Sequence, residues 1–184
     1  MSRGYVRIIG GKWRSRRITI PSVEGVRPTS DRMRETLFNW LAPVIVDRHC
    51  LDLFAGGGAL GFEALSRGAA SLVMVDQSAA VVDSLREQCR VLIAEHVQVY
   101  CAAAPQQLRQ PAIPFDLVFL DPPYQSPLLL ASCFYLAETP GMLAVEAYIY
   151  LETDKLIQDN DLPVGWKIIK SQRAGQAMSY LVKV

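Results

Sequence analysis

The stretch Asp52-Leu53-Phe54-Ala55-Gly56-Gly57-Gly58-Ala59-Leu60-Gly61 decides the fold. It overlaps an apolar run at 50–54 that is typical of a buried strand, and it leads into a helical pattern at 59–67. Glycines between a strand and a helix let the backbone turn sharply and approach a ligand closely. The first N–H groups of the helix have no partner within it. The sequence therefore predicts a ligand-binding turn at the carboxyl end of a strand.

Outward from this turn, strand and helix patterns alternate. Strands are expected at 5–9, 17–20, 50–54, 71–76, 97–101, 115–120, 142–151, 166–170 and 178–184. Helices are expected at 31–41, 59–67, 78–94 and 128–137. This alternation predicts an α/β, Rossmann-like fold with a seven-stranded, mostly parallel sheet covered on both faces. Ligands of such folds bind at the carboxyl ends of the strands.

The composition excludes several classes of protein. Of the 184 residues, 51% are apolar and 20% are charged, which predicts one packed globule rather than a disordered or collagen-like chain. No run of about 18 apolar residues occurs, and the start of the chain has no apolar stretch of signal-peptide length, so we expect a cytoplasmic protein without a membrane span. Four scattered cysteines and two histidines predict free, buried thiols and no metal site.

Basic residues gather near the amino terminus. Residues 1–34 hold nine Lys or Arg and two acidic residues, whereas the remaining 150 hold ten basic and sixteen acidic residues. Two short strands around Gly10-Gly11-Lys12 predict a β-hairpin, and a basic arm on an acidic body is typical of proteins that bind a phosphate backbone. The alternative is a tail that only aids solubility. We expect a basic arm at 1–28, a ligand-binding domain at 29–184, and backbone contacts from Arg7, Lys12, Arg14, Arg16, Arg17, Arg27 and Arg32.

Two acidic residues near the glycine turn indicate which ligand it binds. Gly56, Gly58 and Gly61 match G-x-G-x-x-G, and Asp76 ends the next expected strand, where it can accept hydrogen bonds from a ribose. Taken alone, this pattern fits a nicotinamide-dependent oxidoreductase. Asp52, however, points a negative charge toward the place of a pyrophosphate, which favours a ligand with an α-ammonium group. The alternative is a purely structural carboxylate.

A second constellation, Asp121-Pro122-Pro123-Tyr124, follows the expected strand 115–120. Two successive prolines stiffen the loop and remove two N–H donors, so it presents bare carbonyl oxygens. Asp121 and the Pro122 carbonyl can both accept hydrogen bonds from one exocyclic NH₂ group, and a base can stack on Tyr124. Two acceptors around that nitrogen aim its lone pair at a methyl group. The alternative is a plain strand-to-helix turn.

These motifs resemble those of known enzymes. The D-x-x-x-G-x-G pattern is similar to the S-adenosylmethionine site of Rossmann-like methyltransferases, and the D-P-P-Y loop is similar to the catalytic loop of amino-methyltransferases. With IIGGKWR at 8–14 and RPTSDRMRETLFN at 27–39, they resemble the RsmD family, which methylates a guanine N2 in bacterial 16S ribosomal RNA. The resemblance covers about residues 5–180 and makes 29–184 a methyltransferase domain.

The resemblance implies roles for individual residues. The methionine part of S-adenosylmethionine would be held by Asp52, Phe54, Gly56 and Gly58, its ribose by Asp76, and its adenine would lie near Gln77. The flipped guanine would be held by the catalytic loop: Asp121, Pro122, Pro123 and Tyr124. Methyl transfer would be a direct in-line displacement without a metal, in which positioning supplies most of the rate. Two positions depart from the family pattern: Gly57, where the family has Ser, and Ala103, where it often has an Asp or Asn that binds the adenine amino group.

The resemblance also implies a partner, and other functions stay open. The partner would be 16S rRNA within an assembled or assembling small ribosomal subunit, and we expect a monomer. A DNA or RNA adenine-N6 methyltransferase would use the same tetrapeptide, but a DNA reader needs a recognition domain for which few residues precede the core. A non-catalytic rRNA-binding assembly factor could keep the same fold.

Overall fold

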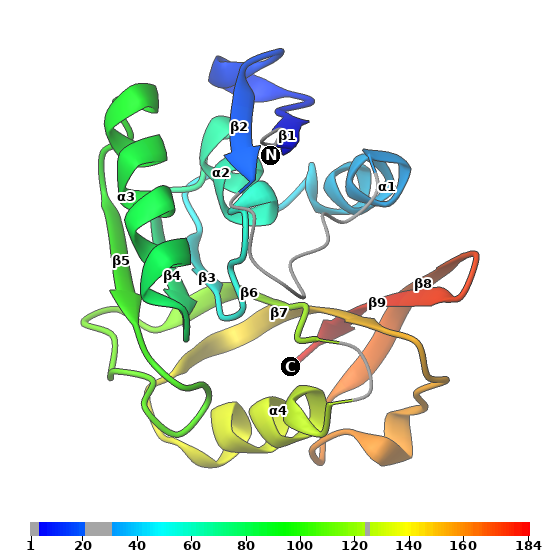
Figure 1. The fold of residues 1–184 in the computed structure, drawn as a ribbon. Coiled ribbons are helices and arrows are strands. Elements are labelled where there is room, and N and C mark those ends of the chain that lie inside the picture. Colours follow the sequence, from blue (N-terminus) through cyan, green and yellow to red (C-terminus); the bar gives the residue numbers. More distant parts are fainter. Residues whose placement is uncertain (1–3, 21–30, 124–125) are drawn as a thin grey trace.

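The computed structural model describes residues 4–20, 31–123 and 126–184. Its centre is a seven-stranded sheet in the order β5-β4-β3-β6-β7-β9-β8 (Figure 1). The sheet strands are β3 (His49–Asp52), β4 (Ser71–Asp76), β5 (Val97–Cys101), β6 (Phe115–Leu120), β7 (Leu143–Thr153), β8 (Lys167–Ala174) and β9 (Ala177–Lys183). Strands β3 to β7 are mutually parallel, and β9 runs antiparallel to both of its neighbours, β7 and β8. The predicted seven-stranded, mostly parallel sheet is confirmed.

Helices cover both faces of the sheet (Figure 1). The helices are α1 (Asp31–Leu41), α2 (Ala59–Ser66), α3 (Ala79–Leu92) and α4 (Leu128–Glu138), with 3₁₀ turns at Gly11–Trp13 and Asp159–Asp161. One apolar core joins α1, α2 and α3 to one face, and a second joins α4 to the other. Neighbouring residues of a strand divide between the two cores, since Cys50 belongs to the first and Leu51 to the second.

A two-stranded hairpin stands at the amino terminus, formed by β1 (Gly4–Arg7) and β2 (Arg17–Ile20). The predicted strand 5–9 is too long at its carboxyl end. The backbone N–H of Ile9 donates to the side chain of Glu63 in α2 instead of to the hairpin partner. At the other end of the chain, β8 runs beyond the predicted residue 170, because it stays paired with β9 as far as Ala174 and Ala177.

The four cysteines are free thiols, as predicted, but they are not all buried. Cys50 and Cys133 are buried, Cys89 is half-buried and Cys101 is exposed. The prediction of buried thiols is therefore wrong for Cys101, which ends a strand at the edge of the sheet. Among the described residues, no helix has the length and apolar character needed to cross a bilayer.

Candidate active site

Three acidic residues lie at the carboxyl ends of three adjacent strands. Asp52 is the last residue of β3, Asp76 is the last residue of β4, and Asp121 follows β6 directly. Strand β3 lies between the other two and is parallel to both. The parallel sheet thus brings together at one edge the carboxylates that the sequence placed there.

Asp52 is buried on the face covered by α2. The residue is only 3% exposed. Its carboxylate oxygen Oδ2 accepts a hydrogen bond of 3.0 Å from the N–H of Gly61. A Cβ at Gly61 would lie 3.1 Å from this oxygen, so a glycine lets the helix approach closely. Burial raises the pKa of Asp52 to about 7; the Gly61 bond lowers it and the charge of Asp76 raises it further. No ion pair to Asp52 exists within the described ranges, so this buried carboxylate lacks a cation.

Asp76 ties the glycine turn to the next strand. Its Oδ2 accepts from the N–H of Gly56 at 3.0 Å, and its Oδ1 accepts from the N–H of Ser78 at 2.8 Å. Gly56 and Gly58 have φ angles of +49° and +74°, in the left-handed region that favours glycine. Each carboxylate oxygen has a further lone pair, so Asp76 can also accept bonds from two hydroxyl groups of a ligand.

The remaining predicted cofactor residues lie around this turn. Phe54 is half-buried and packs against the second core, and Gln77 is exposed just beyond β4. The carbonyl of Gln77 accepts a hydrogen bond of 3.3 Å from the thiol of Cys101, at the end of the neighbouring β5. The β4 and β5 ends therefore form one surface beside Asp76.

The acidic loop after β6 is described as far as Pro123. Asp121 is half-buried, Pro122 is buried and Pro123 is exposed, with its carbonyl accepting from the N–H of Ser126 at 3.3 Å. Tyr124 lies outside the described residues. Burial, together with the charges of Glu152 and Asp121, holds the pKa of the Tyr150 hydroxyl well above its usual range. Tyr150 is thus a neutral donor to Glu152, and Asp121 lies within its electrostatic reach.

Most of the basic residues predicted to contact a phosphate backbone are exposed on the hairpin and at the start of α1. Arg7, Lys12, Arg14, Arg16, Arg17 and Arg32 are all exposed, whereas Arg27 lies outside the described residues. In the part of the chain that the structure covers, none of these six side chains forms an ion pair. Two stack on aromatic rings: the Arg17 guanidinium lies 4.3 Å from the ring centre of Tyr5, and the Lys12 ammonium 4.5 Å from that of Trp13. Their charges are available to a phosphate backbone.

Buried polar groups of α2 hold the hairpin against the sheet domain. Both carboxylate oxygens of the fully buried Glu63 accept from the arm, from Ile9 N–H at 2.7 Å and from Gly10 N–H at 2.8 Å. The hydroxyl of Ser66 accepts from Trp13 N–H at 2.9 Å and donates to the Gly10 carbonyl at 2.5 Å. The hairpin is therefore docked in one orientation, with its basic residues outward.

Two arginines balance the buried charge of Glu63. Arg67 donates its Nε–H to Glu63 at 2.7 Å, and the fully buried Arg34 lies 3.7 Å from the same carboxylate. Arg34 also donates to the Arg7 carbonyl at 2.9 Å, so it joins α1 to the end of β1. Sequence reasoning missed Glu63 and Arg34. A signal did exist for Glu63, because α2 is apolar on every side and a charge in such a helix must be paired.

Glu63→Gln is expected to lower the free energy of unfolding by about 3 kcal/mol, since it removes the buried charge that Arg34 and Arg67 share and leaves the buried Arg34 with Asp31, an exposed residue, as its ion-pair partner. Urea denaturation of the variant and the wild type measures this difference. The matched control is Glu87→Gln on α3, whose ion pair with Arg90 is exposed and whose loss should cost less than about 1 kcal/mol. Equal effects of the two changes would show that the Glu63 network adds nothing beyond a surface ion pair.

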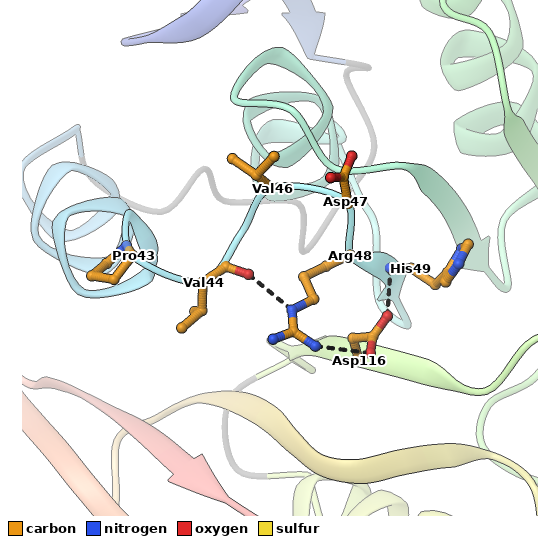
Figure 2. Close-up of a pocket in the computed structure, with 7 residues that line it drawn as sticks. All are labelled: Pro43, Val44, Val46, Asp47, Arg48, His49 and Asp116. Atoms are coloured by element: carbon orange, nitrogen blue, oxygen red, sulfur yellow. Dashed lines mark hydrogen bonds and ion pairs between the residues drawn. The ribbon is translucent and has the colours of Figure 1, made fainter.

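An open polar pocket lies at the opposite edge of the sheet, at the amino ends of β3 and β6 (Figure 2). It is lined by Pro43, Val44, Val46, Asp47, Arg48, His49 and Asp116. Within it, Arg48 donates to Asp116 at 3.1 Å and to the Val44 carbonyl at 2.9 Å, while Asp116 also accepts from His49 N–H at 2.9 Å. These groups satisfy one another and fix the segment between α1 and β3 on β6. This pocket is separate from the edge of the sheet at which Asp52, Asp76 and Asp121 lie.

Comparisons with known proteins cover both the arm and the sheet domain. Residues 6–183 match the family described as conserved hypothetical protein 95. The chain is 46% identical over 173 residues to the ribosomal RNA small subunit methyltransferase D of Escherichia coli. The matched region spans 94% of this chain and 87% of that protein. The chain belongs to the RsmD family. A relative from Haemophilus influenzae with the same name is 41% identical over 180 residues, 95% of this chain and 91% of that protein.

Solved structures agree with this assignment. A protein of Escherichia coli named yhhF and described as a methyltransferase superimposes with a TM-score of 0.87 and 42% identity, covering 98% of both chains. The hairpin and the sheet domain therefore occur together in an RsmD relative. As a member of this family, the protein is a methyltransferase, and the Rossmann-like methyltransferase sheet expected from the sequence is confirmed.

Proposed function

We propose that the protein transfers a methyl group from S-adenosylmethionine to the exocyclic N2 of a guanine in 16S ribosomal RNA. One observation supports this most: Asp52, Asp76 and Asp121 end three adjacent parallel strands in a chain of the RsmD family. An acidic residue at each of these places matches the three parts of the reaction, the methionine moiety, the ribose and the target amine.

The residues of the glycine turn fit S-adenosylmethionine. Asp52 is a buried carboxylate without a cation among the described residues, and an α-ammonium group would supply one. Phe54, Gly56 and Gly58 would hold the rest of the methionine part, Asp76 the ribose hydroxyls, and Gln77 would lie near the adenine. When bound, the cofactor supplies an electrophilic methyl group. The chain itself contributes orientation and a fixed negative charge.

The loop after β6 would hold the flipped guanine. Asp121 and the Pro122 carbonyl accept hydrogen bonds from the N2 amine, which orients the lone pair of a nitrogen that is otherwise a poor nucleophile. Pro123 stiffens the loop, and Tyr124 offers a stacking face. A base must leave its stack to reach this edge of the sheet, which is least costly in an RNA loop.

The basic arm would bind the RNA backbone. Glu63 and Ser66 dock the hairpin rigidly, so that Arg7, Lys12, Arg14, Arg16 and Arg17 face outward together. Arg32 at the start of α1 and Arg27 would add contacts. We propose that the partner is 16S rRNA in an assembled or assembling small ribosomal subunit. The protein would act as a monomer in the cytoplasm. We also propose that the chain divides into an RNA-binding arm at 1–28 and a catalytic domain at 29–184.

The test is transfer of labelled methyl from S-adenosylmethionine to small ribosomal subunits from cells that lack the gene, followed by digestion to nucleosides. Labelled N2-methylguanosine is the expected product. Labelled N6-methyladenosine would contradict the proposed target atom and favour an adenine methyltransferase. Absence of label on any RNA, from protein shown to be folded, would contradict the proposal and favour a binding module.

Replacing Arg14, Arg16 and Arg17 by Ala is expected to weaken RNA binding and flatten its salt dependence. Each lost phosphate contact reduces the slope of log K against log salt by about 0.7 on single-stranded RNA. Filter binding at several salt concentrations measures the slope. The control replaces Lys155, Lys167 and Lys170, three exposed lysines of the carboxyl-terminal third, by Ala. If both triple variants change the slope equally, the arm has no special role.

A further inference from the structure

The order of the strands in the sheet indicates how an extended cofactor would lie across their carboxyl ends. Asp52 on β3 fits the α-ammonium group, and Asp76 on β4 fits the ribose. The strand on the far side of β4 is β5, whose end, Cys101, lies opposite Asp76 in the register. An extended ligand that passes from β3 to β4 therefore brings its adenine to the end of β5. The N–H of Ala102 still pairs with the Asp76 carbonyl at 3.0 Å, so the segment beginning at Ala103 flanks that place.

Gln107 folds back onto this segment. Its backbone N–H donates to the Ala103 carbonyl at 3.0 Å, and its side-chain Oε1 accepts from the Ala103 N–H, also at 3.0 Å. The residue is exposed, as is Ala103, so Gln107 is accessible to a ligand beside the end of β5. The Ala103 N–H also fixes the orientation of the amide, because a backbone donor can bond only to Oε1 and never to the NH₂ group.

A carboxamide held in this way is complementary to adenine. Oε1 has a second lone pair for the 6-amino group, and Nε2–H can donate to the ring nitrogen N1 beside it. Hypoxanthine has an oxygen at position 6 and a protonated N1. Its O6 would therefore face Oε1, which is also an acceptor, and its N1–H would face Nε2–H, which is also a donor.

We infer that Gln107 is a specificity-determining residue, which recognises the adenine edge of the S-adenosylmethionine that the proposed function requires. Ala103 has no polar side chain for this task, and its N–H serves to orient Gln107. The inference assigns a binding role to a side chain on the 102–108 segment, away from the three acidic strand ends.

The experiment compares two ligands by isothermal titration calorimetry, S-adenosylhomocysteine and S-inosylhomocysteine, in which only the base edge differs. Wild-type protein is expected to prefer the adenine compound. Gln107→Ala and Gln107→Met, the second of which keeps the length of the side chain, are expected to raise the Kd for S-adenosylhomocysteine about tenfold. The Kd for S-inosylhomocysteine should not rise, because the variants also remove the mismatched groups, so the preference falls by at least the same factor. Gln106→Ala, at an exposed neighbour, is the control and should keep the preference.

The outcomes are distinguishable. An equal loss of affinity for both ligands would show that Gln107 only supports the loop, and an unchanged preference would show that it does not touch the base; either result overturns the inference while the proposed function stands. Failure of folded wild-type protein to bind S-adenosylhomocysteine at all would overturn the proposed function and this inference together.

Discussion

Asp121→Ala is expected to abolish methyl transfer and to leave cofactor binding unchanged. Asp121 follows β6, whereas the residues proposed to hold the cofactor lie on β3 and β4 and in the glycine turn. Loss of one of the two acceptors lets the target amine turn away from the methyl group. Misplacement by about 1 Å can cost a factor of about 100 in rate, and we expect kcat to fall by at least that much.

Asp121→Asn separates orientation from charge. The amide oxygen of Asn keeps one acceptor at the same position, so this variant should retain more activity than Asp121→Ala. The measurements are single-turnover methylation of small subunits and calorimetry with S-adenosylhomocysteine. Asp83→Ala on α3 removes an equal charge at an exposed site and serves as the control. Wild-type turnover in Asp121→Ala, or equal losses in the Ala and Asn variants, would contradict the proposed acceptor role.

The sequence predicts the acidic edge well because local patterns determine it. Asp76 ends one expected strand run and Asp121 follows another, and the parallel arrangement places them at one edge. Asp52 lies inside the expected strand 50–54, but β3 ends at Asp52 in the structure, so this carboxylate also lies at that edge. The position of β9 between β7 and β8 could not be predicted in this way. Which strands pair depends on contacts between residues far apart in the chain, and no local periodicity encodes them.

The anchoring of the arm was also hidden from the sequence. An arginine on an amphipathic helix is usually solvated, so Arg34 does not differ in type from a surface residue. Glu63 lies in a helix that is apolar on every side, which indicates that its charge needs a partner but not which partner. Only the packed structure shows that the hairpin loop brings the N–H groups of Ile9 and Gly10 to the buried carboxylate of Glu63, beside Arg34 and Arg67. Gln107 was missed for a similar reason, since its role depends on a backbone bond to Ala103.

Asp52→Asn is expected to weaken binding of S-adenosylhomocysteine about 100-fold, because it removes the charge opposite the α-ammonium group while keeping an acceptor for Gly61. The fold should survive, since a neutral side chain of the same shape is easier to bury than a carboxylate. Calorimetry at pH 8 measures the affinity, and urea denaturation measures the stability. Asp76 keeps its charge in this variant, so the comparison isolates the contribution of Asp52.

Asp52→Asn should also change how stability and ligand affinity depend on pH. Burial first, and the charge of Asp76 as well, raise the pKa of Asp52 from 3.8 to about 7, so the folded protein holds a proton that the unfolded chain releases. Asp52 therefore makes the free energy of unfolding fall as pH rises between 3.8 and about 7. Binding an ammonium group requires that the proton leave, so wild-type affinity should rise about tenfold per pH unit well below this pKa. In Asp52→Asn both trends should be lost; a binding profile that keeps the wild-type rise would assign the titrating group elsewhere.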